Sequence, residues 1–272
     1  MALNIREMGP RAASALVLAP LALFAVWLGD AWIVGVMVIV SGLLSVEWAR
    51  MSAPKDWKAI AIAVGLALIA TVVVSPIGGL SVALLTLVFG AAAAGLFARA
   101  RGQSSIDAAY GVFYIGWPAA LLIWLRDGND AIGFYWVTLA FVVAWSADIV
   151  AFLVGSAVGG PKLWPRYSPN KTWSGFIGGL VAGTLAGAAM AALPEAGVVQ
   201  MEWSALLGLA GAGATMAGDL WESALKRRFG VKDAGTLIPG HGGLMDRVDG
   251  LMFAIVVIAI GRALSLYFGG GS

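Results

Sequence analysis

The sequence predicts an all-α integral membrane protein with about nine membrane-spanning helices, and three observations lead to that class. Hydrophobic residues make up 60% of the 272 residues and charged residues only 12%, against about 25% charged in a soluble domain. The mean hydropathy is +0.89. Apolar runs of about 20 residues, long enough to cross a bilayer, recur along the chain between charges, Gly and Pro. We therefore expect a single polytopic membrane domain over residues 1–272.

The expected spans follow one another with short breaks. They lie near residues 11–29, 31–49, 57–75, 77–98, 108–126, 130–154, 172–193, 202–225 and 247–268. The first run lacks a cleavage-site pattern, so we expect it to be retained. Residues 1–140 are expected to form an apolar scaffold, and residues 141–268 are expected to carry the chemistry.

The distribution of Lys and Arg predicts the orientation. With the N-terminus in the cytoplasm, 15 of the 17 Lys and Arg residues fall in cytoplasmic segments, as the positive-inside rule requires. Only Arg126 and Arg262 fall on the other side. The C-terminus is then outside, and the polar loops 155–171 and 226–246 both face the cytoplasm.

The residue inventory limits the chemistry. The chain has no cysteine and one histidine, which excludes disulfides, thiolate catalysis, cysteine-ligated metals and multi-histidine sites. Any metal must therefore rely on oxygen ligands.

The stretch from Gly218 to Asp249 is the main polar segment. Carboxylates alternate with Lys and Arg, and the segment GHGG offers backbone that can approach a ligand closely. This mixture suits a polyanion bound with a divalent cation. On a helix, Asp219, Glu222 and Lys226 share one face. The alternative is a charged loop anchored by snorkelling cations, and it stays open on this chemistry alone.

A second polar stretch, residues 145–175, precedes the span at 172–193. Asp148 lies in an apolar run, where a carboxylate costs about 2.5–3.5 kcal/mol, so we expect it to face the protein interior or a polar cavity. Its alternative role is an interhelical hydrogen bond. Thr172 or Ser174 is expected to cap the following helix. Lys171 would lie at the positive end of that helix, which is unfavourable unless an anion lies there.

The first spans carry little visible chemistry. Glu47 precedes Trp48 and Arg50 and is interpreted as an interfacial residue at the cytoplasmic boundary. Small-residue faces at 91–95 and 178–189 permit tight helix contacts. No internal repeat is visible.

The polar stretches also resemble a known family. The run Ser223–Asp249 reads S-x-x-K-R-x4-K-D-x5-P-G-H-G-G-x-x-D-R-x-D, which closely resembles the signature of the phosphatidate cytidylyltransferases, also called CDP-diacylglycerol synthases. Gly250 stands where a small hydroxyl residue is expected. Residues 145–175 resemble the family more loosely, with Phe152, Ser156 and Ser174 where Tyr, Arg and Glu are expected.

The resemblance implies transfer of CMP from CTP to phosphatidic acid, giving CDP-diacylglycerol and pyrophosphate in phospholipid biosynthesis. It implies Mg²⁺ as a divalent cofactor, membrane lipid as a partner, and a homodimer. No nucleic-acid partner is expected. The expected location is the bacterial inner membrane, with the active site facing the cytoplasm.

The expected site residues, taken from the polar stretches and the resemblance together, form three groups. The catalytic residues are Asp219, Asp246, Lys226 and His241. The substrate-binding residues are Ser168, Lys171, Thr172, Ser223, Arg227, Lys232, Asp233 and Arg247. The metal ligands are drawn from Asp219, Asp246, Glu222, Asp249 and Asp148.

Two other classes of protein share some of these features. A membrane transporter would place its site near the midplane, on broken helices in related halves; here the charges crowd at the predicted cytoplasmic end. Another CTP-dependent lipid enzyme, such as a polyprenol kinase, would bind the nucleotide but transfer the γ-phosphoryl group. The detailed match over residues 223–249 favours the cytidylyltransferase.

Overall fold

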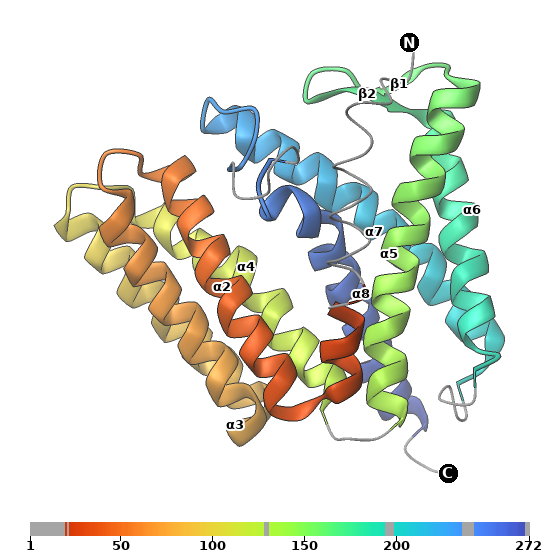
Figure 1. Cartoon of the computed structure of the whole chain (residues 1–272), viewed down its shortest axis with the longest axis horizontal. Coiled ribbons are helices and arrows are strands. Elements are labelled where there is room, and N and C mark those ends of the chain that lie inside the picture. Colours follow the sequence, from red (N-terminus) through yellow and green to blue (C-terminus); the bar gives the residue numbers. More distant parts are fainter. Residues whose placement is uncertain (1–19, 21, 128–130, 194–198, 236–241, 270–272) are drawn as a thin grey trace. The chain divides into compact units, whose positions relative to one another are not determined.

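The chain is helical along most of its length. The computed structural model describes residue 20 and residues 22–127, 131–193, 199–235 and 242–269. The helices are α2 (Asp30–Ser52), α3 (Trp57–Ala100), α4 (Ser105–Arg126), α5 (Ala131–Val158), α6 (Trp173–Met190), α7 (Met201–Arg228) and α8 (Met245–Gly269), as Figure 1 shows. The strands are β1 (Lys162–Trp164) and β2 (Ser168–Thr172).

Six of the described helices, α2 to α6 and α8, are long and apolar enough to cross a membrane. The predicted all-α membrane class is therefore confirmed. Each predicted span from residue 31 onward overlaps a helix. The first predicted span, 11–29, lies mostly outside the described residues, and the count of nine stays a prediction.

Helix α3 is 44 residues long, yet it folds back on itself at Gly79. Gly79 has φ 70° and ψ −176°, a conformation open to glycine because it has no Cβ. A Cβ at Gly90 would lie 2.8 Å from the Cβ of Ala67, so the two arms pack against each other. Their directions are antiparallel in Figure 1. The predicted spans 57–75 and 77–98 correspond to these arms, which are joined without a polar loop.

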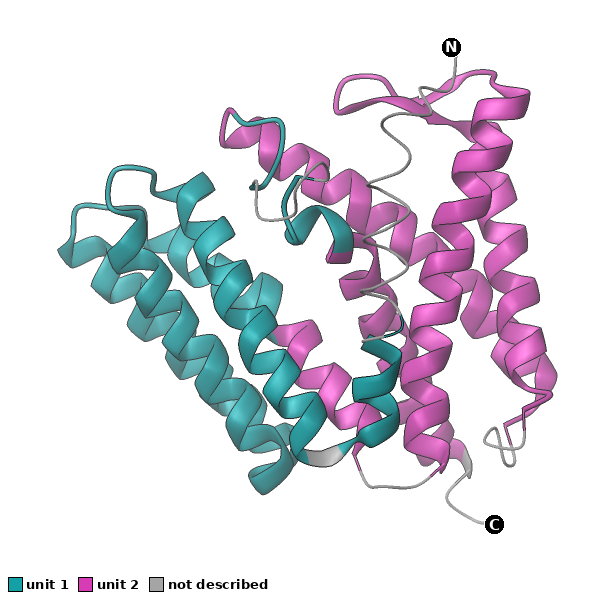
Figure 2. Ribbon diagram, in the orientation of Figure 1, with its two compact units in different colours: residues 1–116, 231–247 teal, residues 117–230, 248–272 magenta. Residues whose placement is uncertain are grey.

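The described chain divides into two compact units, coloured in Figure 2. Unit 1 comprises residues 1–116 and 231–247, and unit 2 comprises residues 117–230 and 248–272. The polar loop that leads into α8 therefore belongs with the N-terminal helices. The prediction of one membrane domain over the whole chain stays a prediction.

In unit 1, the cytoplasmic end predicted for α2 is packed into the interior. Trp48 is fully buried, and its indole N–H donates to the carbonyl of Asp107 at 2.9 Å. Its ring lies 5.7 Å from those of Tyr110 and Tyr114, a distance typical of aromatic pairs. This end of α2 is therefore held by side-chain packing.

In unit 2, α6 packs closely between α5 and α7 through a stripe of glycines. Gly175, Gly179, Gly183 and Gly187 are buried at every fourth position. A Cβ at Gly187 would lie only 2.3 Å from the carbonyl oxygen of Ser204, so the helix backbones approach directly. The small-residue face predicted at 178–189 is therefore used inside the chain.

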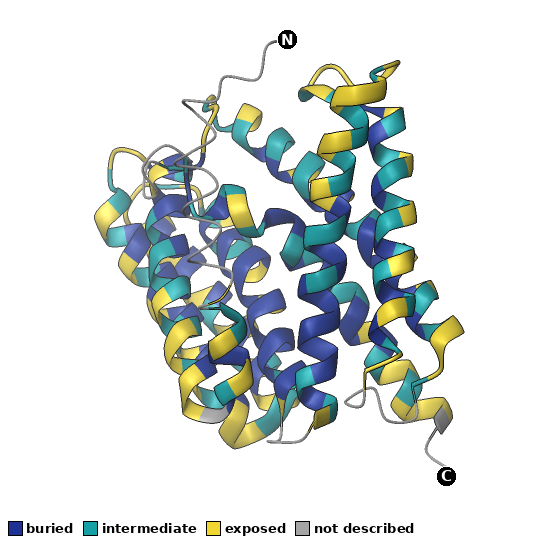
Figure 3. Cartoon of the chain, turned by 45° about the vertical axis from the view of Figure 1, so that its right-hand side comes forward, coloured by how far each residue is buried: buried dark blue, intermediate teal, exposed yellow. Residues whose placement is uncertain are grey.

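The opposite face of α6 is apolar and exposed. Ile177, Val181 and Leu185 are 58%, 54% and 65% exposed. Figure 3 shows the same pattern on the other long helices, with buried positions in stripes and exposed positions beside them. Apolar residues exposed on membrane-spanning helices are expected to face lipid.

The predicted cytoplasmic loop 155–171 contains a hairpin that the sequence pattern did not indicate. Strands β1 and β2 pair antiparallel, with Lys162 opposite Thr172 and Trp164 opposite Ser168. The N–H of Trp173 donates to the carbonyl of Pro161 at 3.0 Å. The hairpin therefore fixes the backbone immediately before α6.

Candidate active site

The start of α6 carries a cap and a lysine. Thr172 is the N-cap, and its hydroxyl accepts a hydrogen bond from the N–H of Gly175 at 3.2 Å, which confirms the predicted cap. Lys171 precedes it on β2 and forms an ion pair with Asp219 of α7. The two side chains are 23% and 33% exposed. The anion expected beside Lys171 is therefore, in this structure, a carboxylate of the protein itself.

Three acidic side chains of unit 2 form what we call the carboxylate cluster: Asp219, Glu222 and Asp249. Glu222 is 1% exposed and accepts from the ammonium of Lys226 at 2.9 Å, as expected for residues that share one helix face. Asp249, on α8, is 8% exposed and accepts from the N–H of Gly250 at 2.8 Å. Its carboxyl group lies beside Glu222 and within electrostatic reach of Asp219 and Lys171.

The cluster combines three carboxyl groups with the two ammonium groups of Lys171 and Lys226. Asp249 and Glu222 share a side-chain hydrogen bond, and a hydrogen bond between two carboxyl groups requires a proton on one of them. Both of these carboxyl groups are buried, where unpaired charge is costly. A bound cation would take the place of that proton.

The donor atoms of the cluster suit a hard divalent cation in their chemistry. Carboxylate oxygens are the preferred ligands of Mg²⁺. Among the residues that the structure describes, however, no group of three or more His, Asp or Glu side chains is arranged to hold a metal ion. Asp219 and Glu222 are instead bonded to lysines. The described residues therefore match Mg²⁺ in the type of ligand atom they offer, but they are not arranged around a common metal position.

Asp246 belongs to unit 1, at the start of α8. Its carboxylate accepts hydrogen bonds from the N–H groups of Ala234 at 3.1 Å and Gly243 at 2.8 Å. Asp219 belongs to unit 2, so the predicted pairing of Asp219 with Asp246 around one metal stays a prediction. Asp246 has backbone partners that its sequence position did not reveal.

The other predicted site residues have varied settings. Arg227, Lys232, Asp233 and Arg247 are exposed, whereas Ser168 and Ser223 are partly buried. Asp148 was predicted to face either the protein interior or a polar cavity. It is exposed on α5, which contradicts the first alternative, and the second stays a prediction. His241 lies outside the described residues.

Glu47 is the polar residue that sequence reasoning misjudged most clearly. It is 1% exposed, and it accepts hydrogen bonds from the N–H groups of Leu244 at 2.8 Å and Met245 at 2.7 Å. All three residues belong to unit 1. The interfacial interpretation is therefore wrong. The available signal was a carboxylate within an apolar span, which is expensive unless it has a partner.

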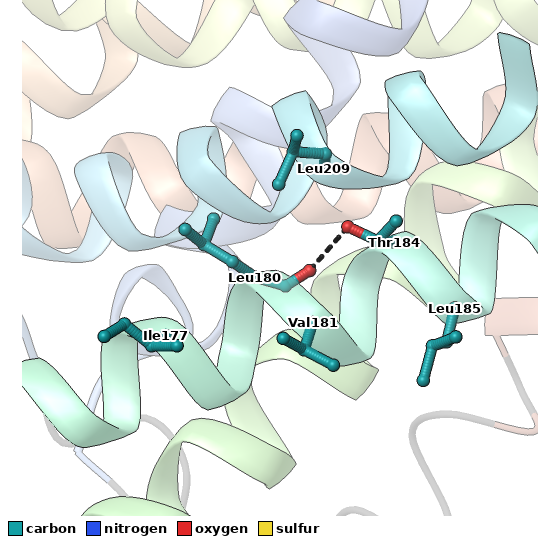
Figure 4. A pocket seen from close by; sticks show the side chains of 6 residues that line it. All are labelled: Ile177, Leu180, Val181, Thr184, Leu185 and Leu209. Carbon is teal, nitrogen blue, oxygen red and sulfur yellow. Dashed lines mark hydrogen bonds between the residues drawn. The ribbon is translucent and has the colours of Figure 1, made fainter. Parts of the chain in front are cut away.

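A separate pocket of about 300 Å³ lies on α6 and α7. Figure 4 shows its lining residues, Ile177, Leu180, Val181, Thr184, Leu185 and Leu209. The hydroxyl of Thr184 donates to the carbonyl of Leu180 at 2.8 Å, so its proton is used within the helix. The pocket has no charged side chain and is unsuited to a phosphate group.

Comparisons with known proteins agree on one relationship. The model of the cytidylyltransferase family matches residues 10–264. A phosphatidate cytidylyltransferase of Brucella abortus biovar 1 (strain 9-941) is 38% identical over 257 residues, which cover 93% of each chain. The phosphatidate cytidylyltransferase of Brucella suis biovar 1 (strain 1330) has the same identity and coverage. That of Staphylococcus saprophyticus is 35% identical over 160 residues, covering 58% of this chain and 60% of the relative.

Proposed function

The chain belongs to the cytidylyltransferase family, and from that premise we propose how its residues act. The enzyme transfers CMP from CTP to phosphatidic acid and releases pyrophosphate, forming CDP-diacylglycerol. The single observation that carries this function is the likeness to phosphatidate cytidylyltransferases along nearly the whole chain. A membrane-embedded enzyme suits a diacyl substrate, because that substrate resides in the bilayer.

The reaction requires charge neutralisation more than proton transfer. A phosphate oxygen of phosphatidic acid attacks the α-phosphorus of CTP, and the bond from that phosphorus to the bridging oxygen of the β-phosphate breaks. The attacking phosphate is already largely ionised near neutral pH, so a strong general base is not required. The protein must hold two polyanions together and offset their repulsion.

The carboxylate cluster is the proposed metal-binding element. Asp219, Glu222 and Asp249 would hold Mg²⁺, with Asp246 and Asp148 as further candidate ligands. The carboxyl oxygens that the cluster gathers support this assignment, because they are the ligands that Mg²⁺ prefers. When bound, the cation supplies charge neutralisation at the phosphate oxygens.

Lys171 and Lys226 are the proposed partners of the substrate phosphates. Each ammonium group is bonded to a carboxylate of the cluster. Lys171 also lies at the start of α6, where the helix N–H groups favour an anion. On substrate binding, Lys171 would leave Asp219 and donate to a phosphate oxygen.

The remaining site residues have supporting roles in the proposal. The exposed cations Arg227, Lys232 and Arg247 would attract CTP by long-range electrostatics. Thr172 would act through the cap that orders the backbone beside Lys171. Ser168, Ser223, Asp233 and His241 would supply hydrogen bonds to the substrates.

The location of the site follows from the charge distribution. With 15 of the 17 Lys and Arg residues predicted in the cytoplasm, the active site would face the cytoplasm, where CTP is available. The bacterial relatives support placement in the plasma membrane. A homodimer, which the family resemblance implies, is part of the proposal; the glycine face of α6 is already packed within the chain.

Labelled CTP tests the function directly. Purified protein would be incubated with dioleoyl phosphatidate and Mg²⁺, using CTP labelled at either the α- or the γ-phosphate. Cytidylyl transfer puts the α label into lipid and the γ label into pyrophosphate. Label from the γ-phosphate in the lipid would instead identify a lipid kinase, and no lipid labelling from either nucleotide would contradict the proposal.

A further inference from the structure

Glu47 makes a long-range contact with both of its carboxylate oxygens. Oε1 accepts from the N–H of Leu244 at 2.8 Å, and Oε2 accepts from the N–H of Met245 at 2.7 Å. The side chain is 1% exposed. Charge-assisted hydrogen bonds of this kind are about twice as strong as neutral ones. They join α2 to the start of α8 within unit 1.

The loop before α8 is shaped around this carboxylate. A Cβ at Gly235 would lie 2.7 Å from Oε1 of Glu47, and a Cβ at Gly243 would lie 2.8 Å from Oε2. Both distances are shorter than real Cβ contacts allow, so glycine permits the close approach. The described ends of the loop, before and after residues 236–241, therefore both lie against Glu47.

Two carboxylates accept the backbone N–H groups around the start of α8. Glu47 accepts from Leu244, which precedes the helix, and from Met245, its first residue, while Asp246 accepts from Gly243 and Ala234 in the loop. The N–H groups at a helix start have no partner within the helix. For Met245, Glu47 supplies that acceptor from a distant helix.

We propose that Glu47 is a positioning residue of the active site, which holds residues 243–245 so that Asp246 is presented in a fixed orientation. The proposal rests on the proposed function insofar as Asp246 takes part in the reaction. A carboxylate that only stabilised the fold would be an expensive choice inside a membrane span. The backbone groups it binds are those that adjoin Asp246.

Glu47→Gln is the most direct test, because it keeps the side-chain shape and replaces one acceptor with an NH₂ group that cannot accept from an N–H. We expect kcat to fall by about 10- to 100-fold, as when a residue that orients a metal ligand is changed. The Mg²⁺ concentration for half-maximal activity should rise as well. Glu47→Asp keeps both acceptors and should recover part of the activity. Glu202→Gln, which neutralises an exposed carboxylate at the start of α7, is the matched control.

Hydrogen exchange tests the contact of Glu47 with residues 244 and 245 independently of enzyme activity, in protein free of metal and substrate. The amides of residues 243–245 should exchange faster in Glu47→Gln than in the wild type or Glu202→Gln, while α6 should not change. Unchanged exchange would overturn the proposal. So would a lowered melting temperature with normal kcat and Mg²⁺ dependence, since that result indicates a purely structural role. An inactive wild-type enzyme would contradict the proposed function instead.

Gly235 provides an independent double-mutant test, because the nearest atoms to its added Cβ all belong to Glu47. Gly235→Ala alone should lower activity at least about tenfold. In a Glu47→Ala background, the same change should lower activity much less, because the clashing carboxylate is gone. Additive effects of the two changes would contradict direct contact between the loop and Glu47.

Discussion

At the scale of single residues, the ion pair between Lys171 and Asp219 joins the two polar stretches of the sequence. Neither residue has a charged partner nearby in the sequence, and 48 positions separate them. Each is partly exposed, so the pair can open when a competing phosphate or cation arrives. That property distinguishes it from a fully buried structural ion pair.

Lys171→Ala should lower kcat/KM by about 100-fold or more, the size of effect seen when a donor to a developing charge is removed. Lys162→Ala is the matched control. Lys162 is an exposed lysine on the same hairpin, and its ammonium donates to the backbone carbonyl of Asn170 at 3.4 Å. Steady-state kinetics on folded, detergent-solubilised protein would check this. Equal, small effects of both changes would show that Lys171 does not contact substrate.

Asp219→Asn and Asp249→Asn should each reduce transfer to below about 1%, because a neutral amide no longer attracts the cation. Asp246→Asn should do the same if Asp246 shares that role, and the double mutant with Asp219→Asn should be little worse than either single one. Activity would be titrated against Mg²⁺ alongside the melting temperature.

The matched control for these variants is Asp56→Asn, which breaks an ion pair with Arg101 of 2.7 Å outside the site. It should leave transfer nearly unchanged. If Asp219→Asn and Asp249→Asn showed normal activity with a lowered melting temperature, the metal-site assignment would be wrong and the carboxylates would serve the fold.

At the scale of helices and strands, local sequence signals were reliable where the partner was near in sequence. Thr172 or Ser174 was predicted as a cap because a hydroxyl residue directly precedes an apolar run, and the structure assigns the cap to Thr172, whose partner Gly175 is only three residues away. The two arms of α3 were predicted because each is a full apolar run. The hairpin of β1 and β2 was not predicted, because its short strands lack a hydrophobic alternation.

The site itself was predictable only in its residue types. Asp219 and Glu222 were indicated by their spacing on one helix face and Asp249 by the family signature, and the structure brings these three together. Glu47 lies 197 and 198 residues from its backbone partners, and no periodicity or short motif encodes that contact. The partner of Lys171 was likewise beyond local patterns, because an ion pair across helices depends on how those helices pack.

The contact between the glycine stripe of α6 and Gly208 of α7 gives a prediction about helix packing. Gly208→Ala should destabilise the protein by about 1–3 kcal/mol, the usual effect of overpacking, since a Cβ there would lie 2.2 Å from the carbonyl oxygen of Gly183 on α6. Gly213→Ala, also on α7, is the control. Its Cβ would meet only Leu180 Cδ2, at 3.7 Å. Denaturation midpoints of both variants would be measured. Equal midpoints for Gly208→Ala and Gly213→Ala would contradict the close packing of α6 on α7.

At the scale of the whole molecule, the charge distribution predicts which side of the membrane each polar segment occupies. The chain has no cysteine, so single cysteines can report accessibility without background. Asn170→Cys, on the exposed part of β2, should react only with a reagent that reaches the cytoplasmic side. Ser272→Cys, beyond the described residues, should react from the outside. Labelling of both from one side would exclude the nine-span topology.

The contact of Glu47 with Leu244 and Met245 also has a consequence for biosynthesis. Ribosomes add roughly 5–20 residues per second, so the 197 residues between Glu47 and Leu244 take roughly 10–40 s to make. Throughout that interval, the N-terminal helices carry a carboxylate whose backbone partners do not yet exist. The nascent protein must keep Glu47 hydrated or otherwise protected until α8 begins to emerge. A chain that terminates before residue 244 would lack both backbone partners of this acidic group.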